Sequence, residues 1–203
     1  MAIRHLQPKR WTYDDLLALP DDGKRYEIIE GELVEMPSPG AIHQIILMNL
    51  ALLLGPIVRL LGGRPLAAPL DVFMPLADPV QPDFAVLLPG GAARISPRGI
   101  EGPPDLVVEV LSPSSARRDI VTKREVYRRG GVREYWIVDP TERAVTVIHA
   151  APDGQVRESR FSDGSRLISP LLPGADLPLA AIFADLDGID DLADLADSNS
   201  PGE

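Results

Sequence analysis

The sequence contains no cysteine among its 203 residues. This absence excludes disulfide bonds, zinc-thiolate sites and a cysteine nucleophile, so any bound metal must be held by oxygen or imidazole ligands. No stretch approaches the roughly 18 consecutive apolar residues that a membrane span needs, and the first residues, MAIRHLQPKRWTYDD, lack the apolar core of a signal peptide. We therefore expect a cytoplasmic protein with no membrane partner.

Positive charge is also scarce, because 20 basic residues face 30 acidic ones and the formal charge is −10. The acids are unevenly distributed. The chain after residue 184 carries no Lys or Arg, and its seven acids leave 23 acids against 20 bases in residues 1–184, a charge of only −3. We therefore expect a single domain over residues 1–184 and an acidic, flexible tail over residues 185–203.

One segment runs against this acidic balance. Between residues 117 and 133, seven bases face two acids, which gives a local charge of +5. Such a patch would suit phosphate groups, although a solvated helix face is the more common explanation of a basic run. The candidate nucleic-acid contacts in this segment are Arg117, Arg118, Arg124 and Arg128.

The order of local patterns predicts a mixed α/β fold. A short helix over residues 13–19, capped by Thr12, precedes a β-hairpin in RYEIIEGELVEM, whose turn lies near Glu30 and Gly31. The longest helix candidate covers residues 41–61, and Gly55-Pro56 is a possible break in it. A further helix within SPSSARRDIVTKREVYRRGG ends at a Gly-Gly pair.

Short apolar runs bounded by proline or glycine predict the strands. Those expected at the centre of the sheet are RPLAAPLDVFMP, PDFAVLLP and PDLVVEVLSP, followed by VREYWIVD, ERAVTVIHA and residues 156–161. Strands as apolar as these need cover on both faces. The expected architecture is therefore an open, mixed central sheet flanked by helices, with an N-terminal β-hairpin.

An acid stands inside the most apolar of these strands. Period-two alternation places Glu109 on one face with Val107 and Leu111. A buried carboxylate is costly unless a cation, a hydrogen-bond donor or a metal meets its charge. Lys123 lies on the apolar stripe of the following helix, at helical spacing from Tyr127. A partly buried ion pair explains these two residues as well as a catalytic site does.

A second carboxylate, Asp83, follows Pro82 where a strand emerges from a loop. A strand-edge cap or turn is the simplest explanation of this residue. Two carboxylates can, however, hold a hard divalent ion such as Mg²⁺. A nearby lysine can then orient water or stabilise negative charge. Together, Asp83, Glu109 and Lys123 predict metal-assisted phosphodiester hydrolysis.

Longer segments carry a family resemblance. YEIIEGELVEMPSPGAIHQ, PDFAVL, PPDLVVEVLSPSS and DIVTKREVYRRGGVREYWIVDP resemble the bacterial Uma family of putative restriction endonucleases, within the PD-(D/E)XK nuclease superfamily. The resemblance covers roughly residues 11–183. It implies a restriction-endonuclease-like core, dependence on Mg²⁺ or Mn²⁺, cleavage of DNA, and assembly into an oligomer, of which a homodimer is the simplest.

The resemblance also assigns roles to single residues. Asp83 matches the aspartate of the PD half-motif and Glu109 the acid of the second half, so both are expected to be metal ligands. Leu111 stands where the usual lysine would follow, and the lysine role moves to Lys123. Glu27 and His43 match two further family positions and are accessory candidates. Asp119 is an accessory candidate on its spacing alone, because it stands four residues before Lys123 and could orient that lysine.

Each accessory candidate also has a simpler interpretation. Glu27 fits a hairpin residue that faces solvent. His43 fits a histidine satisfied within the core. Asp119 fits an i,i+4 partner of Lys123.

The preferred hypothesis is a metal-dependent DNA endonuclease. The alternative is a catalytically inactive module that keeps the nuclease fold for binding or assembly, which the net acidity and the lack of an attached DNA-reading domain favour. A third hypothesis is a metal-dependent hydrolase that acts on another phosphorylated substrate.

Overall fold

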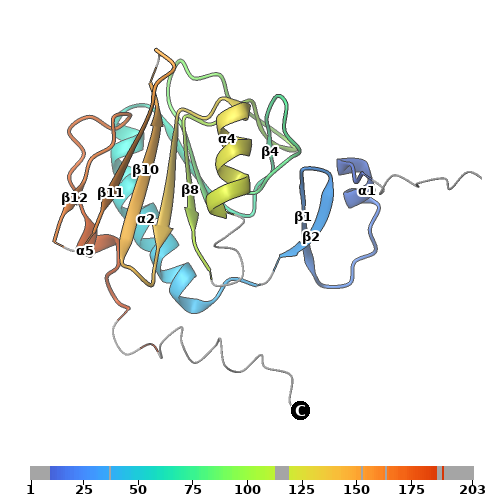
Figure 1. The fold of residues 1–203 in the computed structure, drawn as a ribbon, viewed down its shortest axis with the longest axis horizontal. Coiled ribbons are helices and arrows are strands. Elements are labelled where there is room, and N and C mark those ends of the chain that lie inside the picture. The colour runs from blue at the N-terminus through green and yellow to red at the C-terminus, as the bar shows by residue number, and fades with distance from the viewer. Residues whose placement is uncertain are drawn as a thin grey trace, which may run out of the picture.

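A six-stranded mixed sheet forms the centre of the computed structural model, which describes residues 10–36, 38–112, 119–151, 153–162, 164–186 and 189. Its strands lie in the order β11-β10-β9-β8-β5-β3 (Figure 1). Their bounds are β3 Arg64–Ala67, β5 Phe84–Leu87, β8 Leu106–Val110, β9 Glu134–Asp139, β10 Ala144–Ala150 and β11 Val156–Phe161. This arrangement confirms the predicted mixed α/β fold.

The β8 and β9 strands are the parallel pair of this sheet. Parallel neighbours need a crossover connection, and here it includes the π-helical turn η1 (Asp119–Lys123) and helix α4 (Arg124–Gly130). Helix α4 ends at Gly131, whose φ of 92° is left-handed and favours glycine. The Gly-Gly stop signal in the sequence therefore marks the end of this helix correctly.

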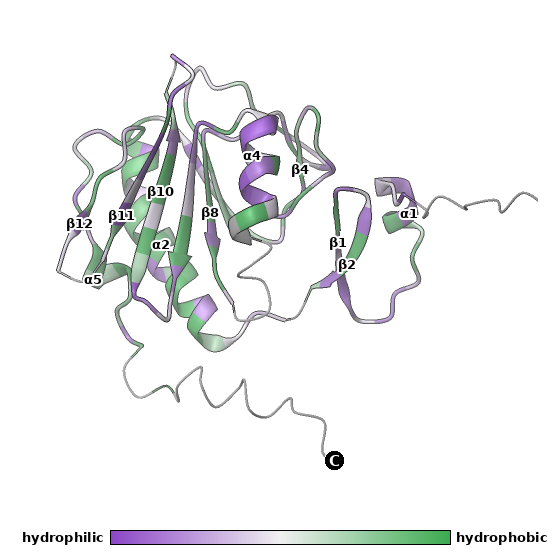
Figure 2. Ribbon diagram, viewed as in Figure 1, coloured by the Kyte–Doolittle hydropathy of each residue, from purple (hydrophilic) through white to green (hydrophobic). Residues whose placement is uncertain are grey.

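Helix α2 (Ala41–Leu60) covers one face of the sheet. Its buried residues Ile46, Leu50, Leu54 and Val58 recur every four positions and pack in one apolar cluster with β5, β8 and β9. Figure 2 shows the apolar residues of this helix. Its 20 residues and mean hydropathy of 1.9 would also suit a membrane span by length and composition alone, as those of many core helices do.

The helix α2 continues through Gly55 and Pro56, so the possible break at this point does not occur. The same face of the sheet also receives the C-terminal part of the domain, namely β12 (Arg166–Leu167), β13 (Leu177–Pro178) and α5 (Leu179–Ile182).

Helix α4 covers the opposite face. Its residues Val126 and Tyr127 share a second apolar cluster with Val107 and Leu111 of the β8 segment. The alternation expected for the 105–111 run is therefore observed, and Glu109 faces α4. A small three-stranded sheet lies on this side as well, formed by β4 (Val72–Phe73), β6 (Arg94–Ser96) and β7 (Gly99–Glu101).

The run RPLAAPLDVFMP does not form one central strand. It divides into β3, which is an edge strand, and β4, which belongs to the small sheet. Proline explains the division, because Pro65 and Pro69 lack the N–H group that a central strand needs on both sides. The prediction that this run lies at the sheet's centre is therefore wrong.

Residues 10–36, here named the N-terminal unit, lie beside α4 (Figure 1), where Glu30 accepts a hydrogen bond from Arg129. Helix α1 (Tyr13–Leu17) begins with a capping box between Thr12 and Asp15, and it ends two residues earlier than predicted. The hairpin of β1 (Arg25–Ile29) and β2 (Glu32–Met36) is a two-stranded sheet of its own. Its turn at Glu30 and Gly31 has φ values of 53° and 83°, as tight hairpin turns require.

A buried carboxylate anchors the C-terminal segment to the central sheet. Glu134 at the start of β9 is fully buried, and its Oε1 accepts hydrogen bonds from Trp136 Nε1 at 2.7 Å and from Ser169 Oγ at 2.6 Å. His149 Nδ1 lies 3.2 Å from Glu134 Oε2. The charge of Glu134 is thus met by three side chains from separate segments, as a buried charge requires.

Replacing Ser169 tests this anchor. Ser169→Ala removes one donor from a buried carboxylate, and we expect the free energy of unfolding to fall by about 1–3 kcal/mol. Ser159→Ala on the exposed strand β11 is the matched control and should leave stability unchanged. Urea denaturation followed by tryptophan fluorescence measures both, and equal stability of the two variants would contradict the anchoring role.

Candidate active site

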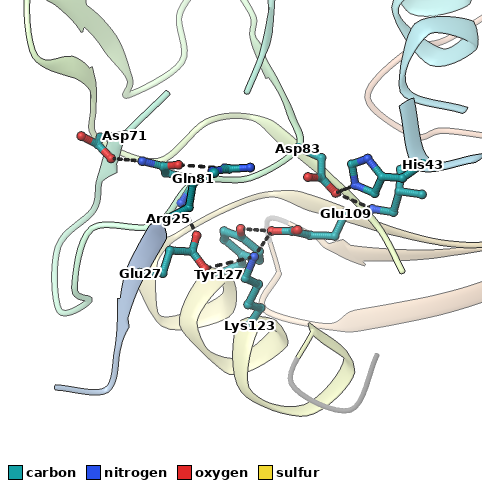
Figure 3. Close-up of polar contacts among 10 residues, drawn as sticks. Arg25, Glu27, His43, Asp71, Gln81, Asp83, Glu109, Lys123 and Tyr127 are labelled. Atoms are coloured by element: carbon teal, nitrogen blue, oxygen red, sulfur yellow. Dashed lines mark hydrogen bonds and ion pairs between the residues drawn. The ribbon is translucent and has the colours of Figure 1, made fainter. Parts of the chain in front are cut away.

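A lysine, a glutamate and a tyrosine meet in the interior between β8 and α4 (Figure 3). Lys123 Nζ lies 3.0 Å from Glu109 Oε1, and the Tyr127 hydroxyl donates to the same oxygen at 2.5 Å. All three side chains are buried almost completely. The charge on Glu109 is therefore met by an ammonium and a hydroxyl, which makes its burial tolerable.

Local structure explains why these groups converge. Lys123 and Tyr127 are four residues apart, so both point from the same side of the helix toward β8. Lys123 is the last residue of the π-helical turn η1, a local form that is frequent at functional sites. Burial, followed by the charge of Glu109, raises the pKa of Tyr127 well above its usual value. The hydroxyl therefore keeps its proton and remains a donor to Glu109.

The hairpin adds a second carboxylate to this cluster. Glu27 Oε2 lies 3.6 Å from Lys123 Nζ, and Glu27 Oε1 accepts the backbone N–H of Gln81 at 2.7 Å. Glu27 is buried, so it does not face solvent as a simple hairpin residue would. Its Oε2 is a buried oxygen without a hydrogen-bond partner, and the ammonium of Lys123 is the charge that offsets it.

Asp83 lies just before β5 and close to the carboxyl end of β8. Its Oδ2 accepts the backbone N–H of Val110 at 2.8 Å and lies 3.0 Å from Nε2 of His43 on α2. The side chain of Asp83 thus supplies the acceptor for a backbone N–H of β8 just beyond the paired residues of β5 and β8. Asp83 therefore contacts the residue that follows Glu109, and 19% of its side chain remains exposed.

His43 stands in the first turn of α2 and reaches Asp83 from that side of the sheet (Figure 3). Its Nε2 faces the carboxylate, whereas its Nδ1 is buried without a hydrogen-bond partner. The histidine is thus held by Asp83. A histidine bonded to a carboxylate in this way fits the satisfied core histidine as well as the accessory role.

The donors at this site are carboxylate oxygens, which suit Mg²⁺ or Mn²⁺ better than softer metals. In the part of the chain that the structure describes, no three His, Asp or Glu side chains group together as a metal site. Mg²⁺ is commonly held by one or two carboxylates and several waters, so Asp83 and Glu109 fit this mode. The ammonium of Lys123 is a competitor for Glu109 Oε1.

The predicted phosphate contacts do not all belong to this cluster. Arg124 is half-exposed and pairs with Glu158 of β11 at 2.8 Å, and Arg128 pairs with Glu125 at 2.7 Å. These two arginines are therefore partly neutralised within the chain. Arg117 and Arg118 lie outside the described residues, as does the side chain of Asp119, whose backbone belongs to η1.

Two residues of the site were missed by sequence reasoning. In the sequence, Tyr127 served only to define the apolar stripe of the helix, although its position four residues after Lys123 could have marked it as a site residue. No pattern in the sequence marked Gln81, because its partners are distant in sequence. Beyond its bond to Glu27, its Nε2 donates to Asp71 Oδ1 at 2.8 Å, and the Tyr13 hydroxyl donates to Asp71 Oδ2 at 2.7 Å.

This chain of bonds ties the N-terminal unit to the site. Burial, together with the hydrogen bond to Asp71, raises the pKa of Tyr13 to about 12, so the phenol remains a donor at neutral pH. Arg25 of β1 also donates to Gln81 Oε1 at 3.3 Å (Figure 3). The position of Glu27 therefore depends on a hydrogen-bonded bridge between the hairpin and the loop before β5.

Comparison with known proteins places this geometry in context. The family model described as Uma2, putative restriction endonuclease, matches residues 13–180. The fold is similar to the crystal structure of a putative nuclease belonging to DUF820 from Anabaena variabilis, with a TM-score of 0.70 and 22% sequence identity. The similarity covers 85% of this chain and 97% of the other. No curated protein matches the chain.

The lysine can be tested by stability as well as by activity. Lys123→Met removes the ammonium beside two buried carboxylates, Glu109 and Glu27, and we expect the free energy of unfolding to fall by about 3–5 kcal/mol. The double variant Lys123→Met, Glu109→Gln should recover part of this loss, because the nearer charge is removed as well. Chemical denaturation measures the change.

The control is Lys24→Met, which removes a lysine from an exposed pair with Glu35 and should have little effect. If Lys123→Met were as stable as Lys24→Met, Lys123 would not be the cation that makes the burial of the two glutamates tolerable.

Proposed function

Because the chain belongs to the Uma2 family of putative restriction endonucleases, we propose that it is a metal-dependent endonuclease that hydrolyses phosphodiester bonds of DNA. The observation that carries this proposal is the buried cluster of Lys123, Glu109 and Tyr127, with Asp83 bonded to the residue next to Glu109. The ammonium of Lys123 and the carboxylates of Glu109 and Asp83 are thus gathered at one end of β8.

The carboxylates are the groups that would hold the metal. Asp83 and Glu109 would bind Mg²⁺ or Mn²⁺, which supplies a water of lowered pKa and neutralises charge on the phosphate. The bond to Val110 N and the contact with His43 fix the orientation of Asp83. The Tyr127 hydroxyl does the same for Glu109. Ligands held in this way lose little conformational entropy when they bind.

Lys123 contributes the positive charge of this chain at the reaction centre. Its ammonium lies between Glu109 and Glu27, in an environment of low dielectric constant where a charge acts strongly. A lysine so placed can orient an attacking water or stabilise the extra negative charge of the phosphorane. Glu27 holds the ammonium from the hairpin side and is an accessory residue in this scheme, as is His43.

Substrate contact requires cations beyond the buried cluster. Arg124 is half-exposed and Arg128 is exposed, and both are paired with surface glutamates. Such pairs contribute little stability. Phosphate groups can therefore replace these glutamates as partners at little cost. The proposed partners are DNA and a second copy of the chain, because cutting both strands needs two active sites.

Acid substitutions test the proposed activity. Asp83→Asn and Glu109→Gln keep the size of each side chain but remove a ligand charge, and each should lower plasmid cleavage with Mg²⁺ or Mn²⁺ by at least about 100-fold. Calorimetry should show a saturable Mn²⁺ site in the natural protein and its loss in both variants. Glu142→Gln, at an exposed position between β9 and β10, is the control and should keep both properties.

One observation favours a second candidate function. Glu109 Oε1 is already engaged by Lys123 and Tyr127, which would suit a nuclease fold kept only for binding or assembly. Such a module would show no Mn²⁺ site that depends on Glu109 and no cleavage of any DNA form. If the folded protein binds no Mn²⁺ through Glu109 and cleaves no DNA, the nuclease proposal is overturned in favour of the binding module.

A further inference from the structure

The ammonium of Lys123 has two carboxylates within reach, at unequal distances. Its Nζ lies 3.0 Å from Glu109 Oε1, which is hydrogen-bond distance, and 3.6 Å from Glu27 Oε2, which is not. The two acids reach it from different elements, β8 and the hairpin (Figure 3). A movement of less than about 1 Å would bring the ammonium to the distance of a charge-assisted hydrogen bond with Glu27.

Glu27 is placed to accept this charge. Its Oε2 is buried and has no hydrogen-bond partner, which is a costly state for a carboxylate oxygen. Its Oε1 accepts the backbone N–H of Gln81 at 2.7 Å, so the carboxylate is fixed beside the lysine. The hairpin therefore holds an acceptor for the ammonium that the observed contacts use only in part.

Glu109 is in the opposite situation, because its Oε1 accepts hydrogen bonds from both Lys123 and Tyr127. A divalent cation on this carboxylate would lie close to the ammonium, and like charges repel strongly in a site of low dielectric constant. The hydroxyl of Tyr127 is neutral and can stay. Metal binding at Glu109 is therefore opposed by Lys123, whereas Tyr127 keeps the carboxylate in position.

The lysine is the movable member of the cluster. Its ammonium stands at the end of a flexible stem with several rotatable bonds. Lys123 is also the last residue of the π-helical turn η1, a local form that is frequent at functional sites. Glu27 and Glu109 belong to strands. A short movement of the ammonium therefore requires no change in the sheet or in the hairpin.

We propose that Lys123 is a charge gate, a cation that moves between two carboxylates. Its ammonium neutralises Glu109 in the arrangement observed, and it passes to Oε2 of Glu27 when Glu109 accepts a divalent cation. Glu27 is then a positioning residue that acts through the lysine and does not touch the metal. The inference deepens the proposed function and rests on it in one respect, because it takes Glu109 as a metal ligand.

Titration calorimetry with Mn²⁺ on a double-mutant cycle tests the gate. Lys123→Met removes the opposing charge and should tighten Mn²⁺ binding by about 10-fold. Glu27→Gln removes the receiving charge and should weaken binding by about 10-fold, because the ammonium then stays on Glu109. In the Lys123→Met background the same Glu27→Gln change should alter the affinity by less than about threefold, since no ammonium is left to receive.

This cycle separates the gate from two simpler roles. If Glu27 were a direct metal ligand, Glu27→Gln would weaken Mn²⁺ binding equally in both backgrounds. If Lys123 were purely structural, Lys123→Met would lower stability and leave the Mn²⁺ affinity unaltered. Either result would overturn the proposal. Lys24→Met, which removes a lysine from an exposed pair, is the matched control and should bind Mn²⁺ as the natural chain does.

A measurement on the natural chain keeps the gate testable if Lys123→Met does not fold. The sequence has three lysines, Lys9, Lys24 and Lys123, and the burial of Lys123 protects its ammonium protons from exchange with water. In a chain labelled with ¹⁵N-lysine, the NMR signal of Lys123 Nζ should shift when Mg²⁺ saturates the protein, and Glu27→Gln should abolish this shift. The exposed Lys24 is the internal control. An unchanged Lys123 signal in the Mg²⁺-bound natural chain would refute the gate.

The gate and the catalytic activity can fail separately. If the cycle behaves as expected but no DNA form is cut, the gate stands and the nuclease activity is refuted. If DNA is cut but the cycle shows no coupling between Lys123 and Glu27, the activity stands and the gate is refuted. Absence of Mn²⁺ binding in both the natural chain and Lys123→Met would also overturn the gate.

Discussion

The ammonium of Lys123 is the interaction on which the rest of the site depends. It lies between Glu109 of the central sheet and Glu27 of the N-terminal hairpin, while the helix that carries it also provides Tyr127. Three elements from distant parts of the sequence therefore share one buried cation. Without it, Glu27 and Glu109 would be buried carboxylates that had lost a neighbouring cation, which is a costly arrangement in a protein.

This dependence links stability to chemistry. Lys123, which is proposed to orient the attacking water, also makes the burial of Glu109 and Glu27 tolerable. Any change at Lys123 alters both properties, so activity of that variant alone cannot separate a catalytic role from a structural one. Asp83 is different, because it is partly exposed and is held by a backbone N–H and by His43. Its charge can be changed with a smaller effect on folding.

The fold was predictable to a useful degree because its signals are local. Alternation placed Glu109 on the face that α4 covers, and the Gly-Gly pair marked the end of that helix. The prediction failed at RPLAAPLDVFMP, where proline divided an apolar run between two sheets. The bond of Gln81 to Glu27 and the fully buried Glu134 left no pattern in the sequence, because their partners come from other elements.

The sequence by itself determined the residue types and the periodicity. It excluded thiolate chemistry, identified the acid in β8 and placed Lys123 on an inward stripe. Only the tertiary structure decided that Glu27 turns inward and that Tyr127 shares an oxygen of Glu109. It also decided that Arg124 and Arg128 have partners within the chain. The physical reason is that a local pattern fixes which face a side chain occupies, whereas its charge partners are set by long-range packing.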